Sequence, residues 1–427
     1  MFKVLVIAYY FPPMGLSGVQ RTLKFTKYMK DYNWEPTVIT SGNTGYFAHD
    51  NSLMKEAEEA GIKIIRTEAK DPNSMLSKFG TIKLPRESVR KLFNRISQTF
   101  FIPDNKISWS KKAAKIAEDI LSKENFDAIF VTCPPFSSFV AIAELKKKFD
   151  VPIFVDYRDL WFDSYFSFYL TPFHRSIHKK LEYNSLKASD KIIVTNRQIK
   201  EKLLNNYQFL SFDDILIIRH GYDAKDFENV QPIPQEHNKM ILTYSGIFVE
   251  YCTPKYFLEA FKLLALERPD IASNIELNFI GLLGKDHLKM IKNLKLEEYI
   301  KHHGYMDHNE VIKKIVSSHV LWFMVGKKKN IEAILPGKVY EYVGSQKPII
   351  ACVPDGAAKT SMEEYKASFI TKPYDVVEIK NTLIHVHDLY KTGKLPVPEM
   401  EYIEKHERKA LTEVLTKQFQ FFLKAEI

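Results

Sequence analysis

The 427-residue sequence contains no apolar run near the roughly 18 residues that a membrane-spanning helix needs. Its first stretch, MFKVLVIAYYFPP, is short and apolar, has no small-residue cleavage site and ends at Pro12-Pro13. We therefore interpret this stretch as a buried strand and not as a signal peptide. These features exclude an integral membrane protein, and we expect a cytoplasmic one.

Cysteine is scarce. The three cysteines, Cys133, Cys252 and Cys352, are odd in number, lie far apart and form no CxxC pair. A disulfide framework and a zinc site of the usual ligand spacing are therefore both excluded, and a reducing cytoplasm fits best. We expect no metal in the functional site. Low-complexity tracts and short repeats are also missing. With 45% hydrophobic and 26% charged residues, the composition is that of an ordinary globular protein.

Acidic residues are outnumbered, with 61 Lys and Arg against 52 Asp and Glu and a formal net charge of +9. A basic balance attracts phosphates of any kind, whether they belong to nucleotides, nucleic acid or anionic lipid. Because the basic residues are spread along the chain and form no recognition motif, we expect no nucleic-acid partner. An ordinary solvated basic surface explains the charge as well.

What the sequence does have is a regular alternation of strands and helices. Residues 3–8 form a compact apolar strand, a Pro/Gly loop follows at 11–20, and residues 36–40 are apolar again after a stretch of near-helical spacing. This order predicts a βαβ unit and hence a parallel sheet. Further strands are expected at 62–67, 127–135, 152–159, 191–196, 215–223, 240–246, 275–281, 297–306, 319–326 and 347–353.

The α/β pattern stops at a polar stretch with Pro232 and Pro234 and then restarts. At roughly 100–200 residues per domain, the length also predicts two domains. We expect a Rossmann-like domain at 1–223, a linker at 224–239, a second Rossmann-like domain at 240–400 and a final amphipathic helix at 401–427. Ligands bind at the carboxyl ends of parallel strands, so residues directly after strands are the candidates for a site.

Two segments of the first half follow strands. Gly15 and Gly18 lie in a loop where the backbone can approach a ligand and the next helix offers N–H groups to an anion, although a plain turn explains them equally. Asp156, Arg158 and Asp159 follow the strand that ends near residue 155. An acid beside an arginine can orient hydroxyls or hold a phosphate, and the alternative interpretation is an Arg–Asp staple of the loop.

In the second half, a helix is expected to start at Pro336-Gly337. Its amides and dipole suit a diphosphate, and Lys338 adds a positive charge. Glu341 lies one turn further on, where a carboxylate can accept two vicinal hydroxyls of a ribose. The predicted donor site comprises Gly246, Leu335, Pro336, Gly337, Lys338, Val339 and Glu341.

Five segments, taken in order, resemble family-four glycosyltransferases of the GT-B fold: FPPMGLSGVQRTLKF, VDYRDLW, RHGYDAKDF, LTYSG and PGKVYEYVGSQKPII. The resemblance implies two Rossmann-like domains whose parallel sheets face an interdomain cleft. It also implies retaining, metal-independent transfer from a UDP- or GDP-linked sugar, which is a substrate, so no cofactor is expected. The donor is expected on the C-terminal domain and the acceptor on the N-terminal domain, with the last helix crossing back to the first domain.

The resemblance implies roles for single residues. Glu341 matches the second glutamate of the family's E-x7-E motif, which holds the donor ribose. Gly15 and Gly18 fall in the loop that faces phosphate or acceptor. His220-Gly221 lies in the interdomain segment where many members have Asn-Gly, and is expected in the cleft.

The sequence departs from the family pattern at several positions. Asp156 and Arg158 lie where many members place a histidine near the reacting sugar, Ala333 replaces the first glutamate of the motif, and Ile247 stands where an arginine is usual. Lys338 occupies a slot often held by proline, and we hypothesise that it supplies part of the missing charge. In a front-face retaining reaction, the leaving phosphate can take the acceptor's proton, so no strong side-chain base is required.

Residues 83–102, KLPRESVRKLFNRISQTFFI, interleave bases with apolar residues at helical spacing. A basic amphipathic helix suits an anionic membrane surface, and many relatives act on lipid-linked acceptors. Peripheral contact with the inner face of the plasma membrane is one interpretation. An ordinary domain helix with its apolar stripe in the core is the other.

Three functions stay open on the sequence alone. We favour a hexosyltransferase-type glycosyltransferase that acts on a glycan or a lipid-linked glycan in bacterial surface-polysaccharide synthesis. A nucleotide-sugar epimerase on the same fold would need additional acid–base residues. A non-catalytic GT-B-like binding or scaffold subunit would agree with Ala333 and with the missing basic residues after Gly246.

Overall fold

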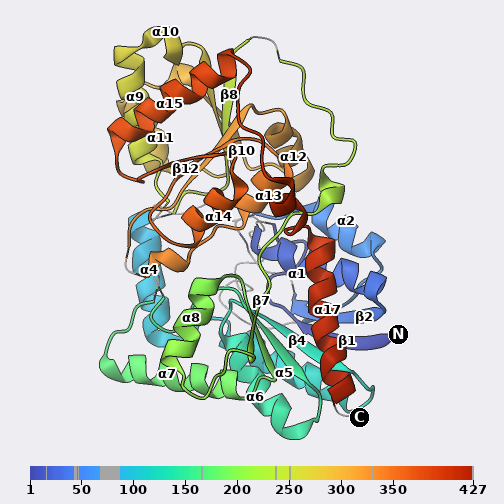
Figure 1. Cartoon of the computed structure of the whole chain (residues 1–427). Coiled ribbons are helices and arrows are strands. Elements are labelled where there is room, and N and C mark those ends of the chain that lie inside the picture. The colour runs from blue at the N-terminus through green and yellow to red at the C-terminus, as the bar shows by residue number, and fades with distance from the viewer. Residues whose placement is uncertain are drawn as a thin grey trace. The chain divides into compact units, whose positions relative to one another are not determined.

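The computed structural model describes residues 1–15, 17–42, 46, 48–67, 87–164, 167–235, 238–249, 252–328 and 330–425. The chain forms two compact units (Figure 1). The first unit comprises Met1–Lys83, Arg90–His220 and Arg408–Ile427, and the second comprises Leu84–Val89 and Gly221–Glu407.

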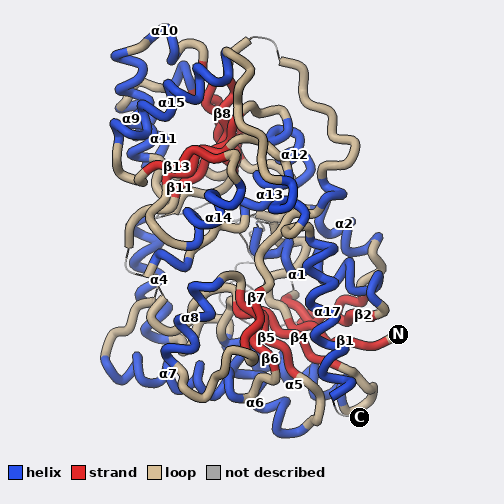
Figure 2. The backbone as a smooth tube through the Cα atoms, in the orientation of Figure 1, coloured by secondary structure: helices blue, strands red, loops and turns tan. Residues whose placement is uncertain are grey.

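Within the described residues of the first unit, seven parallel strands form one sheet in the order β3-β2-β1-β4-β5-β6-β7. Figure 2 shows the strands of this sheet in red, with helices around them in blue. A parallel sheet covered by helices on both faces needs apolar side chains on both, so its strands are continuous apolar runs. β4 and β5 show this, because every residue of both is buried. The strands are β1 Phe2–Ile7, β2 Trp34–Ser41, β3 Lys63–Thr67, β4 Ala128–Cys133, β5 Ile153–Tyr157, β6 Lys191–Val194 and β7 Ile215–Ile217.

Three helices of this part of the chain begin at capping residues that sequence rules favour. Asp50 caps α2 and Asn196 caps α8, each through a side-chain oxygen that accepts backbone N–H groups, and Thr171 caps α7 just before Pro172. The helices are α1 Ser17–Met29, α2 Asn51–Glu59, α4 Glu87–Phe100, α5 Ile107–Leu121, α6 Ser137–Lys148, α7 Pro172–Lys187, α8 Arg197–Asn206 and α17 Arg408–Ala425.

The C-terminal helix α17 belongs to the first unit, where it packs beside α1 (Figure 1). Its Phe419 is 1% exposed, with ring centroids 5.0 Å from Trp34 and 4.5 Å from Phe154. Lys409 pairs with Asp31 at 3.0 Å. The last stretch of the chain therefore completes the core of the sheet formed by the first stretch.

The described residues of the second unit form a six-stranded parallel sheet in the order β10-β9-β8-β11-β12-β13. Trp322 lies at the centre of its core, fully buried and stacked on Phe257 with ring centroids 3.7 Å apart. The strands are β8 Met240–Ser245, β9 Ile275–Ile280, β10 Ile300–Gly304, β11 Val320–Met324, β12 Ile349–Cys352 and β13 Ser368–Thr371. The helices are α9 Lys255–Glu267, α10 Pro269–Ala272, α11 Lys285–Asn293, α12 His308–Val316, α13 Lys338–Gly344, α14 Ala357–Tyr365, α15 Val376–Lys391 and α16 Met400–Glu404.

The predicted fold class is confirmed: each unit is an α/β domain built on a parallel sheet. The strand expected at 215–223 is shorter, because the chain leaves the sheet after Ile217. All three cysteines are free and buried. None of the described helices combines the length and the apolar character that crossing a bilayer requires.

Candidate functional site

Strand order reverses once in each sheet, between β1 and β4 in the first unit and between β8 and β11 in the second. In open α/β sheets, ligands bind outside the carboxyl ends of the strands at such a switch point. The candidates Gly15 and Gly18 follow β1, and Gly246 follows β8. The glycines predicted from the sequence therefore lie at the sheet edges where ligands bind in this kind of fold.

Asp156 in the first unit has both carboxylate oxygens engaged and is 0% exposed. Arg21 of α1 donates to it through Nε and Nη2 at 2.8–3.1 Å, and Thr132 donates its hydroxyl at 3.1 Å. Arg21 also donates to the carbonyls of Ile218 and Arg219. Arg21 and Asp156 thus link α1 to the ends of the strands. The catalytic role of Asp156 stays a prediction.

Arg158 is also largely buried, at 6% exposed. Its guanidinium donates to three backbone carbonyls, those of Cys133 at 2.9 Å, Gly18 at 2.6 Å and Pro134 at 3.3 Å. The side chain thus ties the start of α1 to the loop after β4. A direct role of Arg158 toward a substrate likewise stays a prediction.

Positive charge gathers at this edge of the first sheet. Burial lowers the pKa of His220 well below its usual value, and the nearby charges of Arg21, Arg408 and Arg158 lower it further, so the imidazole is neutral. The pKa of Asp159 is raised by burial, against the opposing charge of Arg158. An edge rich in arginine favours anionic groups.

The two glycine candidates have different surroundings. The buried amide of Gly15 donates to the carbonyl of Ala48 at 2.9 Å. A Cβ at Gly18 would meet nothing within 4 Å, so packing imposes no need for glycine there. His220 and Gly221 lie at the boundary itself, because the first unit's central stretch ends at His220 and the second unit resumes at Gly221.

The first unit contains a cavity of about 170 Å³ at the carboxyl edge of its sheet. Aromatic rings dominate its lining, and its walls come from separated parts of the chain. The aromatic side chains of the lining are Tyr10, Phe136, Trp161, Phe168, Tyr169 and His178. No single segment of the sequence carries a pattern that predicts this cavity.

His178 of α7 is a buried polar residue of this lining, at 6% exposed. Its Nδ1 accepts a hydrogen bond from the indole N–H of Trp161 at 3.0 Å. Burial, and secondarily the nearby His174, lowers the pKa of His178 to about 4, so the ring is neutral and its proton lies on Nε2. Nε2 has no hydrogen-bond partner in the part of the chain that the structure describes. A buried donor left unpaired costs about 1–3 kcal/mol.

A buried carboxyl group fixes the loop that carries Trp161. Tyr157 and Tyr207 donate their hydroxyls to Glu182, and the amide of Trp161 donates to the hydroxyl of Tyr157 at 2.7 Å. Burial raises the pKa of Glu182 to about 7, although these hydrogen bonds oppose the rise. The cavity wall is thereby joined to a titratable group inside the core.

In the second unit, Gly246 makes room for a lysine. It has φ +123°, and a Cβ built on it would lie 2.7 Å from Nζ of Lys338. Nζ donates to the hydroxyl of Tyr244 at 2.5 Å and lies 3.7 Å from the centroid of that ring. The backbone conformation at 246 therefore favours glycine, and the absence of a Cβ leaves room for Nζ of Lys338 in its present position.

The ammonium group of Lys338 is held at the carboxyl end of β8. Burial lowers its pKa to about 8, with Cys252 and Glu341 acting in the opposite direction. Helix α13 is fixed to the same strand, because the amide of Ser245 donates to the hydroxyl of Tyr342 at 2.7 Å. A partly desolvated cation at this edge is suited to an incoming anion.

The other donor-site candidates frame the start of α13. Leu335, Pro336 and Gly337 are half-buried, whereas the side chain of Val339 is fully buried. Val339 can offer only its backbone, and its amide already donates to the carbonyl of Pro336 at 3.1 Å. Since α13 has only seven residues, the charge of Lys338 is a firmer basis for an anion site than the helix start.

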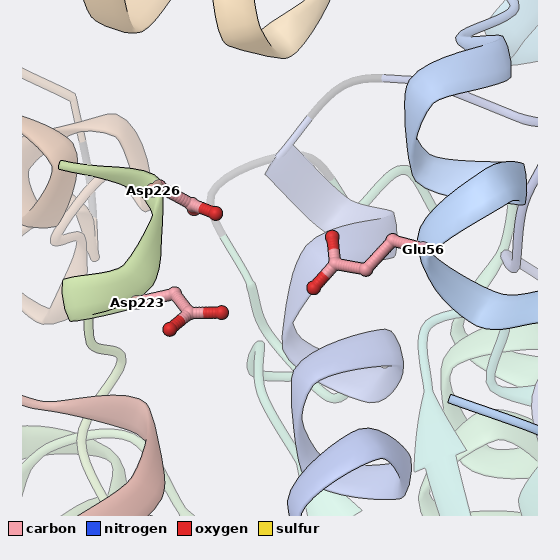
Figure 3. Close-up of side chains that lie close together, drawn as sticks. All are labelled: Glu56, Asp223 and Asp226. Atoms are coloured by element: carbon pink, nitrogen blue, oxygen red, sulfur yellow. The ribbon is translucent and has the colours of Figure 1, made fainter. Parts of the chain in front are cut away.

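Glu341 has a partner within its own unit. Its carboxylate lies 3.8 Å from Nδ1 of His308, and Nε2 of His308 lies 2.8 Å from a carboxylate oxygen of Asp226. Asp226 and the capping residue Asp223 extend from the short 3-10 helix η3, Ala224–Asp226 (Figure 3). The predicted grip of Glu341 on a ribose stays a prediction.

The remaining carboxylate in Figure 3 is Glu56, which extends from α2 of the first unit. It pairs in that unit with Lys24 at 2.8 Å and Lys27 at 2.7 Å. The expectation of a site without metal stays a prediction.

Helix α4 covers most of the segment 83–102, of which residues 83–86 lie outside the described part of the chain. Leu92, Phe93, Ile96 and Phe100 are 59%, 64%, 45% and 77% exposed. The interpretation of a helix with its apolar stripe in the core is therefore wrong for these four side chains. Elsewhere on α4, Gln98 accepts from the amide of Phe168 at 2.7 Å and lines the cavity.

Comparison with known proteins gives the chain its fold family. The sequence model of Glycosyltransferase Family 4 matches residues 18–226. No curated protein matches the chain in sequence.

Solved structures match over essentially the whole length. A glycosyltransferase from Rickettsia africae aligns with a TM-score of 0.64, 16% identity and 99% of both chains covered. A sucrose-phosphate synthase from Thermosynechococcus elongatus gives 0.67, with 12% identity and 100% of both chains covered. The Anabaena protein HepE in complex with UDP and glucose gives 0.60 at 15% identity, covering 98% of this chain and 100% of HepE. At these identities, the structural likeness shows the fold: the chain has the fold of the GT-B glycosyltransferases, and its residues 18–226 match the model of Glycosyltransferase Family 4.

Proposed function

We propose that the chain transfers a hexose, with retention of configuration and without a metal, from a UDP- or GDP-linked donor to a glycan or lipid-linked glycan. The observation that carries the proposal is the ammonium group of Lys338, held against Gly246 and Tyr244 at the carboxyl end of β8. The family match over residues 18–226 and the likeness to HepE, solved with UDP and glucose, support it. Synthesis of a bacterial surface polysaccharide is the process that we infer from the family.

Departure of the nucleoside diphosphate is the step that this lysine would assist. Negative charge grows on the leaving diphosphate as the anomeric bond breaks, and a fixed cation placed before the reaction stabilises that charge. Glu341 would turn from His308 to the ribose hydroxyls, and the leaving phosphate would take the proton of the acceptor hydroxyl. In the first unit, Asp156 and Arg158 would act as positioning residues, and the half-buried Asp159, which follows Arg158 in the chain, would be the carboxyl group that meets a substrate.

Nucleotide affinity tests the role of Lys338. We expect Lys338→Met to weaken UDP or GDP binding about ten- to a hundredfold in calorimetry, because a hydrogen bond to a charged group contributes about 1.5–3 kcal/mol. Lys359→Met is the matched control, since Lys359 lies in the same unit and pairs only at the surface with Asp355. Equal losses in both variants, or no loss in either, would overturn the assignment.

The same lysine sets the pH dependence. Its pKa is about 8 in the free protein, so it carries its charge below that pH and loses it above. We expect nucleotide affinity to be level up to about pH 8 and to fall as the pH rises further, and Lys338→Met to remove the fall.

The proposed contact between Glu341 and the ribose can be tested with a nucleotide that lacks the ribose hydroxyls. We expect Glu341→Gln to weaken UDP but to leave the dideoxy analogue at the affinity that wild type shows for it. The pair of changes then forms a double-mutant cycle that isolates the ribose contact. Additive losses would show that Glu341 only supports the local structure through His308.

A non-catalytic binding subunit is the second candidate, favoured by Ala333 at the motif position and by Ile247 after Gly246. Release of free nucleoside diphosphate from a panel of nucleotide-sugars separates the two functions. Binding of nucleotide without release, in the presence of acceptor glycans, would establish the binding subunit.

For the acceptor, we propose peripheral contact with an anionic membrane on its cytoplasmic side through α4. The exposed apolar side chains Leu92, Phe93, Ile96 and Phe100 support this, as do the neighbouring bases Lys91 and Arg95. Co-sedimentation with phosphatidylglycerol vesicles should be lost in Phe93→Ser/Phe100→Ser and weakened in Lys91→Glu/Arg95→Glu. The charge-matched control on α5 is Lys111→Glu/Lys115→Glu, and equal sedimentation of all variants would remove the proposal.

A further inference from the structure

One imidazole ring of the second unit lies between two carboxylates. Nδ1 of His308 is 3.8 Å from a carboxylate oxygen of Glu341, and Nε2 of the same ring is 2.8 Å from a carboxylate oxygen of Asp226. The side chain of His308 is 5% exposed, that of Asp226 13% and that of Glu341 14%. The three side chains therefore form a chain of contacts that is largely shielded from solvent and ends at Glu341.

The elements that carry Asp226 and Glu341 pack against each other. Gly344 lies one turn after Glu341 on α13. A Cβ built on Gly344 would lie 2.6 Å from ring atoms of both Tyr222 and Phe227, the residues that flank η3 in the chain. Glycine at 344 therefore allows the segment that carries Asp226 to lie directly against α13.

Hydrogen bonding fixes the orientation of the ring. An ionised carboxylate accepts and does not donate, so Nε2–H of His308 donates to Asp226. This bond leaves Nδ1 as the ring nitrogen that faces Glu341. His308 is also the first residue of α12, a helix that is held in place by the buried Ile312 and Ile315. Both the backbone and the ring of His308 are thus fixed.

The two carboxylates match a ring that is protonated on both nitrogens. A bare Nδ1 is an acceptor and would repel a carboxylate, whereas a doubly protonated histidine donates from each nitrogen. The 3.8 Å between Nδ1 and Glu341 exceeds the length of an N–H···O hydrogen bond, about 2.7–3.2 Å, so the attraction is between charges. Such an attraction weakens only slowly with distance, and it therefore persists when Glu341 turns towards a ligand.

A charge held beside Glu341 can place the carboxylate before a nucleotide binds. A glutamate side chain has three rotatable bonds, and ordering such a side chain at the moment of binding weakens affinity. Contact residues are kept in place by the residues behind them. Because the ring of His308 is more deeply buried than Glu341, it would act on a ligand through Glu341.

We propose that His308 is a positioning residue of the nucleotide site: protonated on both ring nitrogens and oriented by Asp226, it holds the Glu341 carboxylate where it accepts the ribose hydroxyls. The ribose contact of Glu341 belongs to the proposed function, and the positioning role rests on it. The contact between His308 and Glu341 in the free protein does not.

A pair of nucleotides tests the positioning role in the full-length protein. Calorimetry compares UDP or GDP with its 2′,3′-dideoxy analogue. We expect His308→Leu to weaken the ribonucleotide about three- to tenfold and to leave the dideoxy analogue at its wild-type affinity, which also shows that the variant is folded. His385→Leu is the matched control, because it makes the same change at an exposed histidine of α15 in the same unit.

A double variant shows whether His308 acts through Glu341. We expect His308→Leu/Glu341→Gln to bind the ribonucleotide no more weakly than Glu341→Gln alone, because without the carboxylate His308 has nothing to position. A further loss in the double variant would contradict the positioning role.

Two amide variants separate the two contacts of the ring. The side-chain nitrogen of asparagine replaces Nδ1, so His308→Asn keeps a donor towards Glu341, whereas that of glutamine replaces Nε2, so His308→Gln keeps the donor to Asp226. We expect His308→Asn to recover most of the ribonucleotide affinity that His308→Leu loses, and His308→Gln to recover little. A merely structural role, in which His308 only ties η3 to α12, predicts the reverse order. That order, or equal recovery by both variants, would overturn the proposal.

NMR of the protein labelled with ¹⁵N in its histidines observes the ring without any nucleotide. The signals that disappear in His308→Asn belong to His308. We expect them to show a proton on each nitrogen in wild type and to change in Glu341→Gln. A ring with one proton, or signals that Glu341→Gln leaves unchanged, would contradict the proposed contact.

The Glu341→Gln variant distinguishes failure of the inference from failure of the proposed function. If Glu341→Gln weakens only the ribonucleotide but His308→Leu weakens both nucleotides or neither, the positioning role is wrong and the ribose contact stands. If Glu341→Gln affects the two nucleotides equally, the ribose contact is wrong, and the positioning role falls with it even where NMR shows the contact with His308.

Discussion

The buried charged residues of the two units differ in how many of their hydrogen-bonding groups already have a partner within the protein. Arg21 and Asp156 are both fully buried and form an ion pair, and their remaining hydrogen bonds go to Thr132 and to the carbonyls of Ile218 and Arg219, so they hold strands and helix together. Lys338 is held by one hydroxyl and one aromatic ring, and its pKa is lowered by burial. Groups with remaining bonding capacity at a strand end are the better candidates for ligand contact, which is why the functional proposal rests on Lys338.

Glu182 gives a prediction at the same scale, because its pKa is raised from 4.5 to about 7. Between these two pH values the folded protein keeps a proton on Glu182 that the unfolded chain releases. The contribution of Glu182 to the free energy of unfolding is therefore fully present below pH 4.5 and is lost as the pH rises through 7. In Glu182→Gln that pH-dependent part disappears.

The measurement is urea denaturation of both proteins across the pH range. The stability of wild type minus that of Glu182→Gln should fall by roughly 2–3 kcal/mol between about pH 5 and pH 8. All other titrating groups are common to both proteins and cancel in the difference. A difference that does not change with pH would show that Glu182 is already ionised in the folded protein at pH 5.

Among the elements, α17 has the clearest role, because it completes the core of the first unit through one aromatic side chain. Phe419 is 1% exposed and packs between the rings of Trp34, Phe130 and Phe154. We expect Phe419→Ala to lower the free energy of unfolding by about 3–5 kcal/mol. On the same helix, Phe421 is 66% exposed, so Phe421→Ala should change it by less than about 0.5 kcal/mol.

The sequence predicted the helices and strands better than it predicted what each of them packs against. The continuous apolar runs of β4 and β5 predicted buried parallel strands, because burial on both faces leaves a pattern within one segment. The stripe of α4 predicted a helix correctly, but it could not say what the stripe faces. Periodicity records which side chains share a face, and only the neighbouring elements determine whether that face is covered.

At the scale of the molecule, the proposed function divides between the two units, with the nucleotide in the second and the acceptor in the first. Hydrogen exchange of the full chain tests the nucleotide half of this division. Saturating UDP or GDP should slow the amides around Gly246 and α13 of the second unit and leave those around Trp161 and His178 of the first unchanged. Nucleotide at about 100 times its Kd should also add about 2.7 kcal/mol of stability. Protection by nucleotide confined to the first unit would contradict the division.

The sequence by itself determined the two α/β halves, their parallel sheets, the glycine after β8 and the lysine at the start of α13. These features are written in local patterns of burial, period and turn residues, which act over a few neighbours in the chain. The tertiary structure alone decided that Arg21 neutralises Asp156, that α17 completes the first core, and that seven separate stretches of the chain line the cavity beside His178. Those outcomes depend on contacts between residues far apart in the chain, and such contacts leave no local pattern to read.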